Sequence, residues 1–134
     1  MSDRADVSAW VEKAEHDLVA VDAISVGSDP PWDIVVFHAQ QAAEKFLKAF
    51  LVSRGHQPPK THDLTRLLTI CVADAPELAS FADDCVFLSP LAVLSRYPGG
   101  EPEPDSARED AEKGVEIARR IRGAILPRLL AAGQ

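Results

Sequence analysis

With 134 residues, 46% of them hydrophobic and 26% charged, the chain is long and apolar enough for one folded domain, and a wholly disordered chain is excluded. Acidic residues outnumber basic residues by 21 to 14, so the formal net charge is −7. Proteins that bind DNA or RNA without sequence preference present a basic face to the phosphates, so this charge argues against that class and leaves room only for a local basic site. We expect a single domain over residues 1–134, with its core at about residues 5–130.

The first part of the chain predicts two long helices. Between residues 7 and 25 apolar side chains recur every three or four residues, which is the spacing of one helical face; they are Val7, Trp10, Val11, Ala14, Leu18 and Val21. A glycine- and proline-rich turn ends this helix. The second helix is predicted from about Pro31 to Arg54, with a broad apolar arc facing the core. Gly55 closes it, because glycine accepts the left-handed conformation in which helices often end.

Two further helical regions are predicted in the middle of the chain. A proline-stiffened loop over residues 56–60 precedes a third helix, for which Thr61 is the expected N-cap. A fourth region follows Pro76 and reaches Leu94. We expect it to kink or break near Pro90, since proline removes a helix hydrogen bond.

The last predicted helix follows an exposed loop rich in proline and glycine, residues 97–104. Ser106 and Glu109 have the spacing of a capping box, so the helix is expected to start there and to bend or end at Pro127. No segment alternates apolar and polar residues as a strand does. The predicted fold is therefore all-α, an up-and-down bundle of four to five helices.

The usual catalytic and metal-binding motifs are absent from the sequence. There is no HExxH, CxxC, GxSxG, glycine-rich phosphate loop or EF-hand loop. Cys71 and Cys85 are predicted to be small buried hydrophobic residues without chemistry. We expect no metal and no cofactor. No signal peptide and no stretch of ~20 apolar residues is found, so we expect no membrane contact and a cytoplasmic location.

One polar stripe on the second predicted helix is a candidate binding site. Its members lie within roughly 80° of one another at the helical repeat; they are His38, Gln41, Lys45 and Lys48. An imidazole, an amide and two ammonium groups in a row can receive a phosphate chain, or can hydrogen-bond carboxylates of a neighbouring helix. The alternative is a solvated face, on which Gln40, Glu44 and the lysines only keep the helix soluble.

His38 stands at the border between this stripe and the apolar arc, where an imidazole needs a hydrogen-bond partner. Asp17 or Glu15 on the first helix is a candidate for that partner.

Two other sites carry groups suited to phosphate. His62 stands at the start of the third helix, where free amides favour anions, so it either helps to hold a phosphate or only caps the chain. Arg96 and Tyr97 close the fourth region. Arginine there either recognises a phosphate bidentately or only satisfies the carbonyls at the helix end.

Four segments, in this order, resemble the HEPN domain family: WVEKAEHDL at residues 10–18, FHAQQAAEKFLKA at 37–49, THDL at 61–64 and SRYP at 95–98. The similarity covers about residues 5–130. It implies an up-and-down bundle that is commonly dimeric, and that is often encoded beside a minimal nucleotidyltransferase with which it forms a toxin–antitoxin-like pair.

Many HEPN proteins are metal-independent ribonucleases whose signature is an arginine, four to six intervening residues and a histidine at a dimer interface. The signature is absent here, since Arg54 precedes His56 by two positions and His62 by eight. By position, the resemblance implies nucleotide or partner binding, rather than catalysis, for His38, Gln41, Lys45, Lys48, His62, Arg96 and Tyr97, with Asp17 in support.

Three functional interpretations are open. The first is a non-catalytic HEPN homodimer that docks a minimal nucleotidyltransferase and binds a nucleotide or RNA ligand. The second is a divergent ribonuclease in which His38 or His62 is the general acid/base and Arg96 or a lysine stabilises the phosphorane. The third is a purely structural dimer. The first two need the polar groups of the second helix to converge with Arg96 and Tyr97 in one recess.

Overall fold

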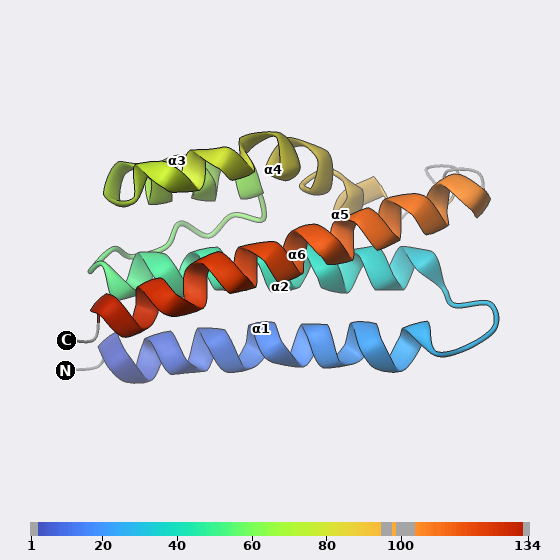
Figure 1. Cartoon of the computed structure of the whole chain (residues 1–134), viewed down its shortest axis with the longest axis horizontal. Helices are drawn as coiled ribbons and strands as arrows, with labels where there is room; N and C mark the ends of the chain where they lie inside the picture. Colours follow the sequence, from blue (N-terminus) through green and yellow to red (C-terminus); the bar gives the residue numbers. More distant parts are fainter. Residues whose placement is uncertain (1–2, 95–97, 99–103, 133–134) are drawn as a thin grey trace.

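The computed structural model describes residues 3–94, 98 and 104–132, and within these ranges every regular element is a helix. The elements, shown in Figure 1, are α1 (Asp3–Ser25), α2 (Trp32–Ser53), α3 (Leu64–Asp74), the 3₁₀ helix η1 (Pro76–Phe81), α4 (Ala82–Leu88), α5 (Leu91–Leu94) and α6 (Pro104–Ala132). The predicted all-α bundle is confirmed. In the described part of the chain, η1, α4 and α5 together correspond to the predicted fourth region, so the bundle has five helical segments.

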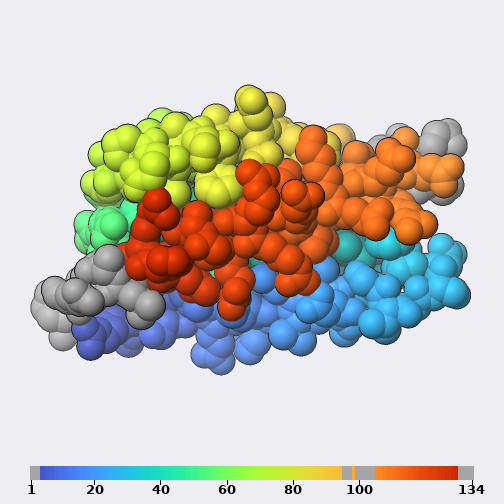
Figure 2. Space-filling view, viewed as in Figure 1, coloured from blue at the N-terminus to red at the C-terminus, as the bar shows by residue number. Residues whose placement is uncertain are grey.

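α2 is the central helix of the bundle. It contacts α1, α3, α5 and α6, and thirteen of its 22 residues are buried. Phe46, Leu47, Phe50 and Leu51 are fully enclosed on it. In Figures 1 and 2, α6 crosses in front of α2, between α1 on one side and α3 and α4 on the other. Because neighbours surround α2, its polar side chains are also drawn into the packed part of the molecule.

The end of α2 follows the sequence prediction. Gly55 has a φ of +83°, and its amide donates to the carbonyl of Val52 at 3.0 Å. Glycine is suited to this position because it lacks the Cβ that makes left-handed backbone costly. The chain can therefore reverse direction directly after the helix.

After this reversal, residues 54–63 run back along α2 as an extended segment, seen as the thin tube between α2 and α3 in Figure 1. The carbonyl of His62 accepts a 2.8 Å hydrogen bond from Gln40, in the middle of α2. Further on, the thiol of Cys71 donates to the carbonyl of Leu47 at 3.7 Å. The later residue, Cys71, thus contacts a later position on α2 than His62 does. α3 therefore runs in the same direction as α2.

The N-cap of α3 is Asp63, so the prediction of Thr61 is wrong. The Asp63 carboxylate accepts from the Thr65 amide at 3.0 Å and from the Thr65 hydroxyl at 2.6 Å. The hydrogen bond from the Thr65 side chain is the main cause that lowers the pKa of Asp63. Thr61 instead accepts from the Asp63 amide at 3.1 Å. The carboxylate has the better position for the free amides of the first turn.

The fourth region breaks at Pro90, as predicted. α4 ends at Leu88 and α5 begins at Leu91, and the Pro90 carbonyl accepts from the amides of Val93 and Leu94. Its first part is the 3₁₀ helix η1, which the apolar spacing did not predict.

α6 starts earlier than predicted and does not end at Pro127; a bend at Pro127, the other predicted outcome, stays a prediction. It begins at Pro104, so Ser106 and Glu109 lie inside the helix and the predicted capping box is wrong. Proline suits the first turn because its fixed φ is helical and its missing amide has no partner there in any case. Pro127 does not end α6, which continues to Ala132. The buried Ile125 keeps this stretch of α6 packed against the core on the N-terminal side of the proline.

The predicted burial of the two cysteines is confirmed. Both are fully buried, and burial raises the pKa of Cys71 and of Cys85 to about 12.

Among the described residues no group of three or more histidine, cysteine or acidic side chains is placed to hold a metal. No helix in those same ranges combines the length and apolar character needed to cross a bilayer.

Candidate ligand-binding site

Two members of the predicted stripe meet on one carboxylate. His38 Nδ1 donates to Asp17 Oδ1 at 2.9 Å, and Lys45 Nζ donates to Asp17 Oδ2 at 2.6 Å. Asp17 is buried on α1, so it holds α1 against α2 at this level. The prediction of Asp17 as a partner of His38 is confirmed. The other candidate, Glu15, binds Arg122 of α6 through two hydrogen bonds of 2.6 and 2.9 Å, which raise the pKa of Arg122.

The other lysine of the stripe meets His62 on a second carboxylate. Lys48 Nζ donates to Glu44 Oε2 at 3.1 Å, and His62 Nδ1 donates to Glu44 Oε1 at 2.8 Å. Glu44 and Lys48 are only 3% and 7% exposed, whereas the His62 side chain is 75% exposed. A carboxylate only accepts, so Nδ1 of His62 carries the proton and Nε2 is left on the outer side of the ring.

The amides of α2 extend the second of these clusters. Gln41 Nε2 donates to Gln40 Oε1 at 2.7 Å, and Gln40 Nε2 donates to the His62 carbonyl at 2.8 Å. We refer to the two clusters, one on Asp17 and one on Glu44, together as the polar seam; its members are Asp17, His38, Gln40, Gln41, Glu44, Lys45, Lys48 and His62. Every buried side-chain nitrogen and oxygen in the described residues has a partner.

The solvated-face alternative is wrong for three of its members, Gln40, Glu44 and Lys48. Gln40 is fully enclosed and Glu44 nearly so, because residues 54–63 fold back over them. A helical wheel places both on a polar side of α2, but it cannot show that a later segment covers that side. Burial of a carboxylate without a cation is costly, and Lys48 supplies the cation here.

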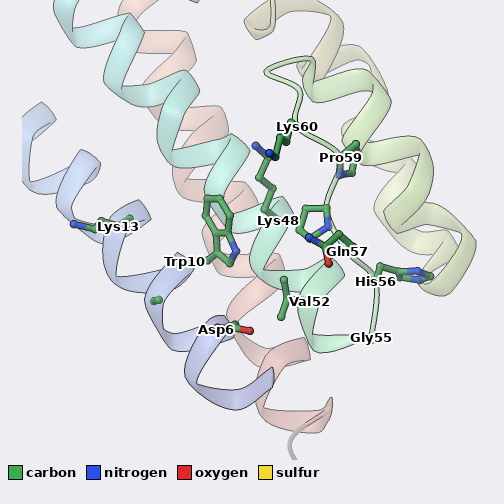
Figure 3. Close-up of a pocket in the computed structure, with 12 residues that line it drawn as sticks. Asp6, Trp10, Lys13, Lys48, Val52, Gly55, His56, Gln57, Pro59 and Lys60 are labelled. Carbon is green, nitrogen blue, oxygen red and sulfur yellow. The ribbon is translucent and has the colours of Figure 1, made fainter. Parts of the chain in front are cut away.

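A depression of about 710 Å³ opens at one end of the seam. It lies between the beginning of α1, the last turns of α2 and the loop at residues 55–60 (Figure 3). Trp10 lines it together with Lys13, Lys48 and Lys60, and Lys48 Nζ is 5.4 Å from the centre of the Trp10 ring. We call it the Trp10 depression. Of the predicted site residues that the structure describes, only Lys48 lines it.

Sequence reasoning missed this depression because its parts come from three distant segments. Trp10 was assigned to the apolar face of the first helix, and Lys60 to a connecting loop. No local pattern joins these segments, since Lys48 and Lys60 reach the depression from α2 and from the loop after it.

Comparison with known proteins supplies the family. The family model of the HEPN domain matches residues 7–128. The chain belongs to the HEPN domain family. The solved structures include that of ST0689, described as an archaeal HEPN homologue, which is 28% identical with a TM-score of 0.70 over 92% of this chain and 97% of that chain. Among curated proteins no match is found.

In this HEPN domain, five of the predicted site residues converge on one side of α2. His38 and Lys45 meet at Asp17, Lys48 and His62 meet at Glu44, and Gln41 is linked through Gln40 to His62. The other two predicted residues, Arg96 and Tyr97, lie outside the described residues.

The seam of this HEPN domain is nearly neutral in charge. Each of the two carboxylates is matched by one ammonium group, and each also orients one imidazole through Nδ1. Such an arrangement fixes side chains in place and can present an oriented histidine to a ligand.

Proposed function

We propose that this HEPN protein acts by binding, as the non-catalytic homodimeric partner of a minimal nucleotidyltransferase in a cytoplasmic toxin–antitoxin-like pair. In this proposal the nucleotide lies along the polar seam. Its contacts are the predicted set, namely His38, Gln41, Lys45, Lys48, His62, Arg96 and Tyr97, with Asp17 in support. The observation that supports the proposal most is the convergence of polar groups from α1, α2 and residues 54–63 on one side of α2.

Binding is favoured over catalysis for two reasons. The arginine of the HEPN ribonuclease signature does not stand at the required distance before any histidine. In addition, Lys45 and Lys48 are each paired with a carboxylate, which lowers the positive field that they offer to a phosphorane. Paired and oriented groups of this kind suit recognition of a ligand that brings its own hydrogen-bond acceptors and donors.

The test is co-purification and nucleotide-dependent thermal stabilisation. We expect the nucleotidyltransferase encoded beside this protein to co-purify with it, and a nucleotide at ~100 Kd to raise Tm by on the order of 5–10 °C. Lys48→Ala should lose that shift and Lys113→Ala should keep it, because Lys113 contacts Phe87 outside the seam. Each variant is compared with its own Tm without nucleotide, since Lys48→Ala also removes the cation paired with Glu44. Absence of both a partner and a nucleotide shift would refute the proposal.

One observation favours a second candidate, the divergent metal-independent ribonuclease. His62 is exposed while its Nδ1 is held by the buried Glu44, which is how an enzyme orients a general base. This candidate requires that the protein cleaves RNA in the presence of a metal chelator. His62→Ala should abolish that cleavage. His16→Ala is the matched control, because His16 is also exposed but lies 3.9 Å from its acidic neighbour. Cleavage that survives His62→Ala would remove this candidate.

A further inference from the structure

We infer that the Trp10 depression is the binding site for a mononucleotide, with the base stacked on Trp10 and the phosphates held by Lys60 and Lys48. The inference rests on the proposed nucleotide binding and restricts its contacts. Of the predicted site residues that the structure describes, Lys48 alone lines the depression, so the nucleotide lies at this end of the polar seam and not along its length. It assigns binding roles to Trp10 and Lys60, which lie outside the predicted set of site residues.

The distribution of charge points to an anion at this place. The chain carries a net charge of −7 and has five lysines, of which three line the depression. Lys45 is paired with Asp17 and Lys48 with Glu44, whereas within the described ranges neither Lys13 nor Lys60 has an ion-pair partner, so the uncompensated charge at the depression comes from these two lysines. Asp6 also lines the depression. In Figure 3 it lies beyond Trp10 from Lys48 and Lys60, so the lysine side remains positive.

Lys48 is held in a fixed position at the rim of the depression. Its ammonium group lies between the buried Glu44 carboxylate, at 3.1 Å, and the Trp10 ring, at 5.4 Å from the centre. Lys60 comes from the loop and is exposed. In Figure 3 the Lys13 side chain points away from Trp10, so we assign it no contact with the ligand. One anchored and one exposed ammonium group suit a short phosphate chain.

The walls of the depression suit a flat aromatic base. Trp10 is half-buried, and Val52, Pro58 and Pro59 add apolar surface on the other side. Stacking of a base on an aromatic side chain contributes ~1–3 kcal/mol. The volume of about 710 Å³ falls in the range of small-molecule sites. Two consecutive prolines limit the motion of the loop, which lowers the entropy lost on binding.

The chemistry favours a mononucleotide over an RNA strand. Each phosphate of a strand needs a compensating cation, and a strand that extended beyond the depression would meet an acidic surface. Only two lysines face the ligand here, and Lys48 is already paired with Glu44, so the depression has too few cations for a strand with many phosphates. The net charge of −7 repels a longer polyanion.

Trp10 fluorescence tests the inference. The chain has two tryptophans, so Trp32→Phe leaves Trp10 as the only reporter. Titration with ATP should change its emission saturably. Lys60→Ala should weaken ATP binding by ~10-fold, which corresponds to the loss of one charge contact, and Lys113→Ala should leave it unchanged. Adenosine and tripolyphosphate should each bind at least ~10-fold more weakly than ATP, since each lacks one half of the interaction.

Calorimetric titration of ATP into Lys60→Ala, with both tryptophans in place, repeats the test without Trp32→Phe. Thermal stabilisation by ATP that neither changes Trp10 emission nor depends on Lys60 would overturn the inference and leave the proposed function standing. Co-purification of the nucleotidyltransferase without binding of any nucleotide would overturn the inference and the nucleotide part of the proposal together. Tripolyphosphate that binds as tightly as ATP would overturn the stacking role of Trp10. Tighter binding of a short single-stranded RNA would overturn the choice of a mononucleotide.

Discussion

The buried pair of Glu44 and Lys48 should be worth several times more to the stability of this domain than an exposed pair of the same spacing. Removal of one partner leaves the other charge without compensation in the packed interior, which typically costs ~3–5 kcal/mol. Lys48 lies at the rim of the Trp10 depression, so its long side chain can reach water. We therefore expect Glu44→Leu to lower the free energy of unfolding by about 2–4 kcal/mol.

A double-mutant cycle isolates the interaction between the two side chains. Lys48→Met should also destabilise, because it leaves the Glu44 carboxylate with His62 alone. The double variant should return to within about 1 kcal/mol of the parent, since an apolar pair of similar volume replaces the ion pair. The coupling energy should therefore be about 2–3 kcal/mol. Urea unfolding at fixed protein concentration measures it, with the slope of each transition checked for constancy.

The chain offers a matched control for this cycle. Arg108 and Glu112 are also four residues apart on a helix, with the guanidinium Nε 3.4 Å from the carboxylate, but their side chains are 63% and 58% exposed. Their coupling energy should be at most about 0.5 kcal/mol. If the cycle on Glu44 and Lys48 gave the same small value, Lys48 would be effectively solvated, and the description of the seam as a buried network would be refuted.

Three further predictions concern stability and reactivity. Gly114→Ala should destabilise the protein, because an added Cβ would lie 3.0 Å from the nearest neighbouring side-chain atom. At Gly123 an added Cβ meets nothing within 4 Å, so Gly123→Ala should stabilise the protein by up to about 1 kcal/mol through helix propensity. Equal shifts in Tm for the two variants would contradict this. Asp63→Ala should cost about 1 kcal/mol through the lost N-cap. The pKa of Asp63 is lowered from 3.8 mainly by a threonine hydrogen bond. The parent should therefore be more stable than Asp63→Ala by the full amount above pH 3.8, and the difference in unfolding free energy should vanish as pH falls through the lowered pKa. An unchanged difference at about pH 2 would contradict this. Cys71 and Cys85, whose pKa values burial raises to about 12, should react with a thiol reagent at about pH 8 only after unfolding; rapid labelling of the native protein would show that their burial is wrong.

Local spacing was sufficient to predict most of the fold. The apolar repeats define α1 and α2 to within a few residues, and Gly55 and Pro90 mark the reversal after α2 and the break before α5. The errors at Thr61 and Ser106 are of one kind. In each case several nearby residues can occupy a helix start, and the choice depends on where the rest of the bundle places the first turn.

The site was predictable only in part, because its geometry is set by long-range packing. The need of His38 for a carboxylate pointed to α1, but the choice of Asp17 over Glu15 depends on Arg122 of α6, which takes Glu15. Burial of Glu44 depends on a segment that returns along α2 some eighteen residues later in the chain. No helical pattern contains that information.

An NMR titration of the isotope-labelled chain with ATP tests the central claim most directly, since it observes every backbone amide at once. The account predicts that chemical-shift changes gather at the indole and backbone amides of Trp10, at Lys48 and at residues 55–60, and that they fade towards the far end of α2. Changes centred on another face of the bundle, or none at saturating ATP, would contradict it.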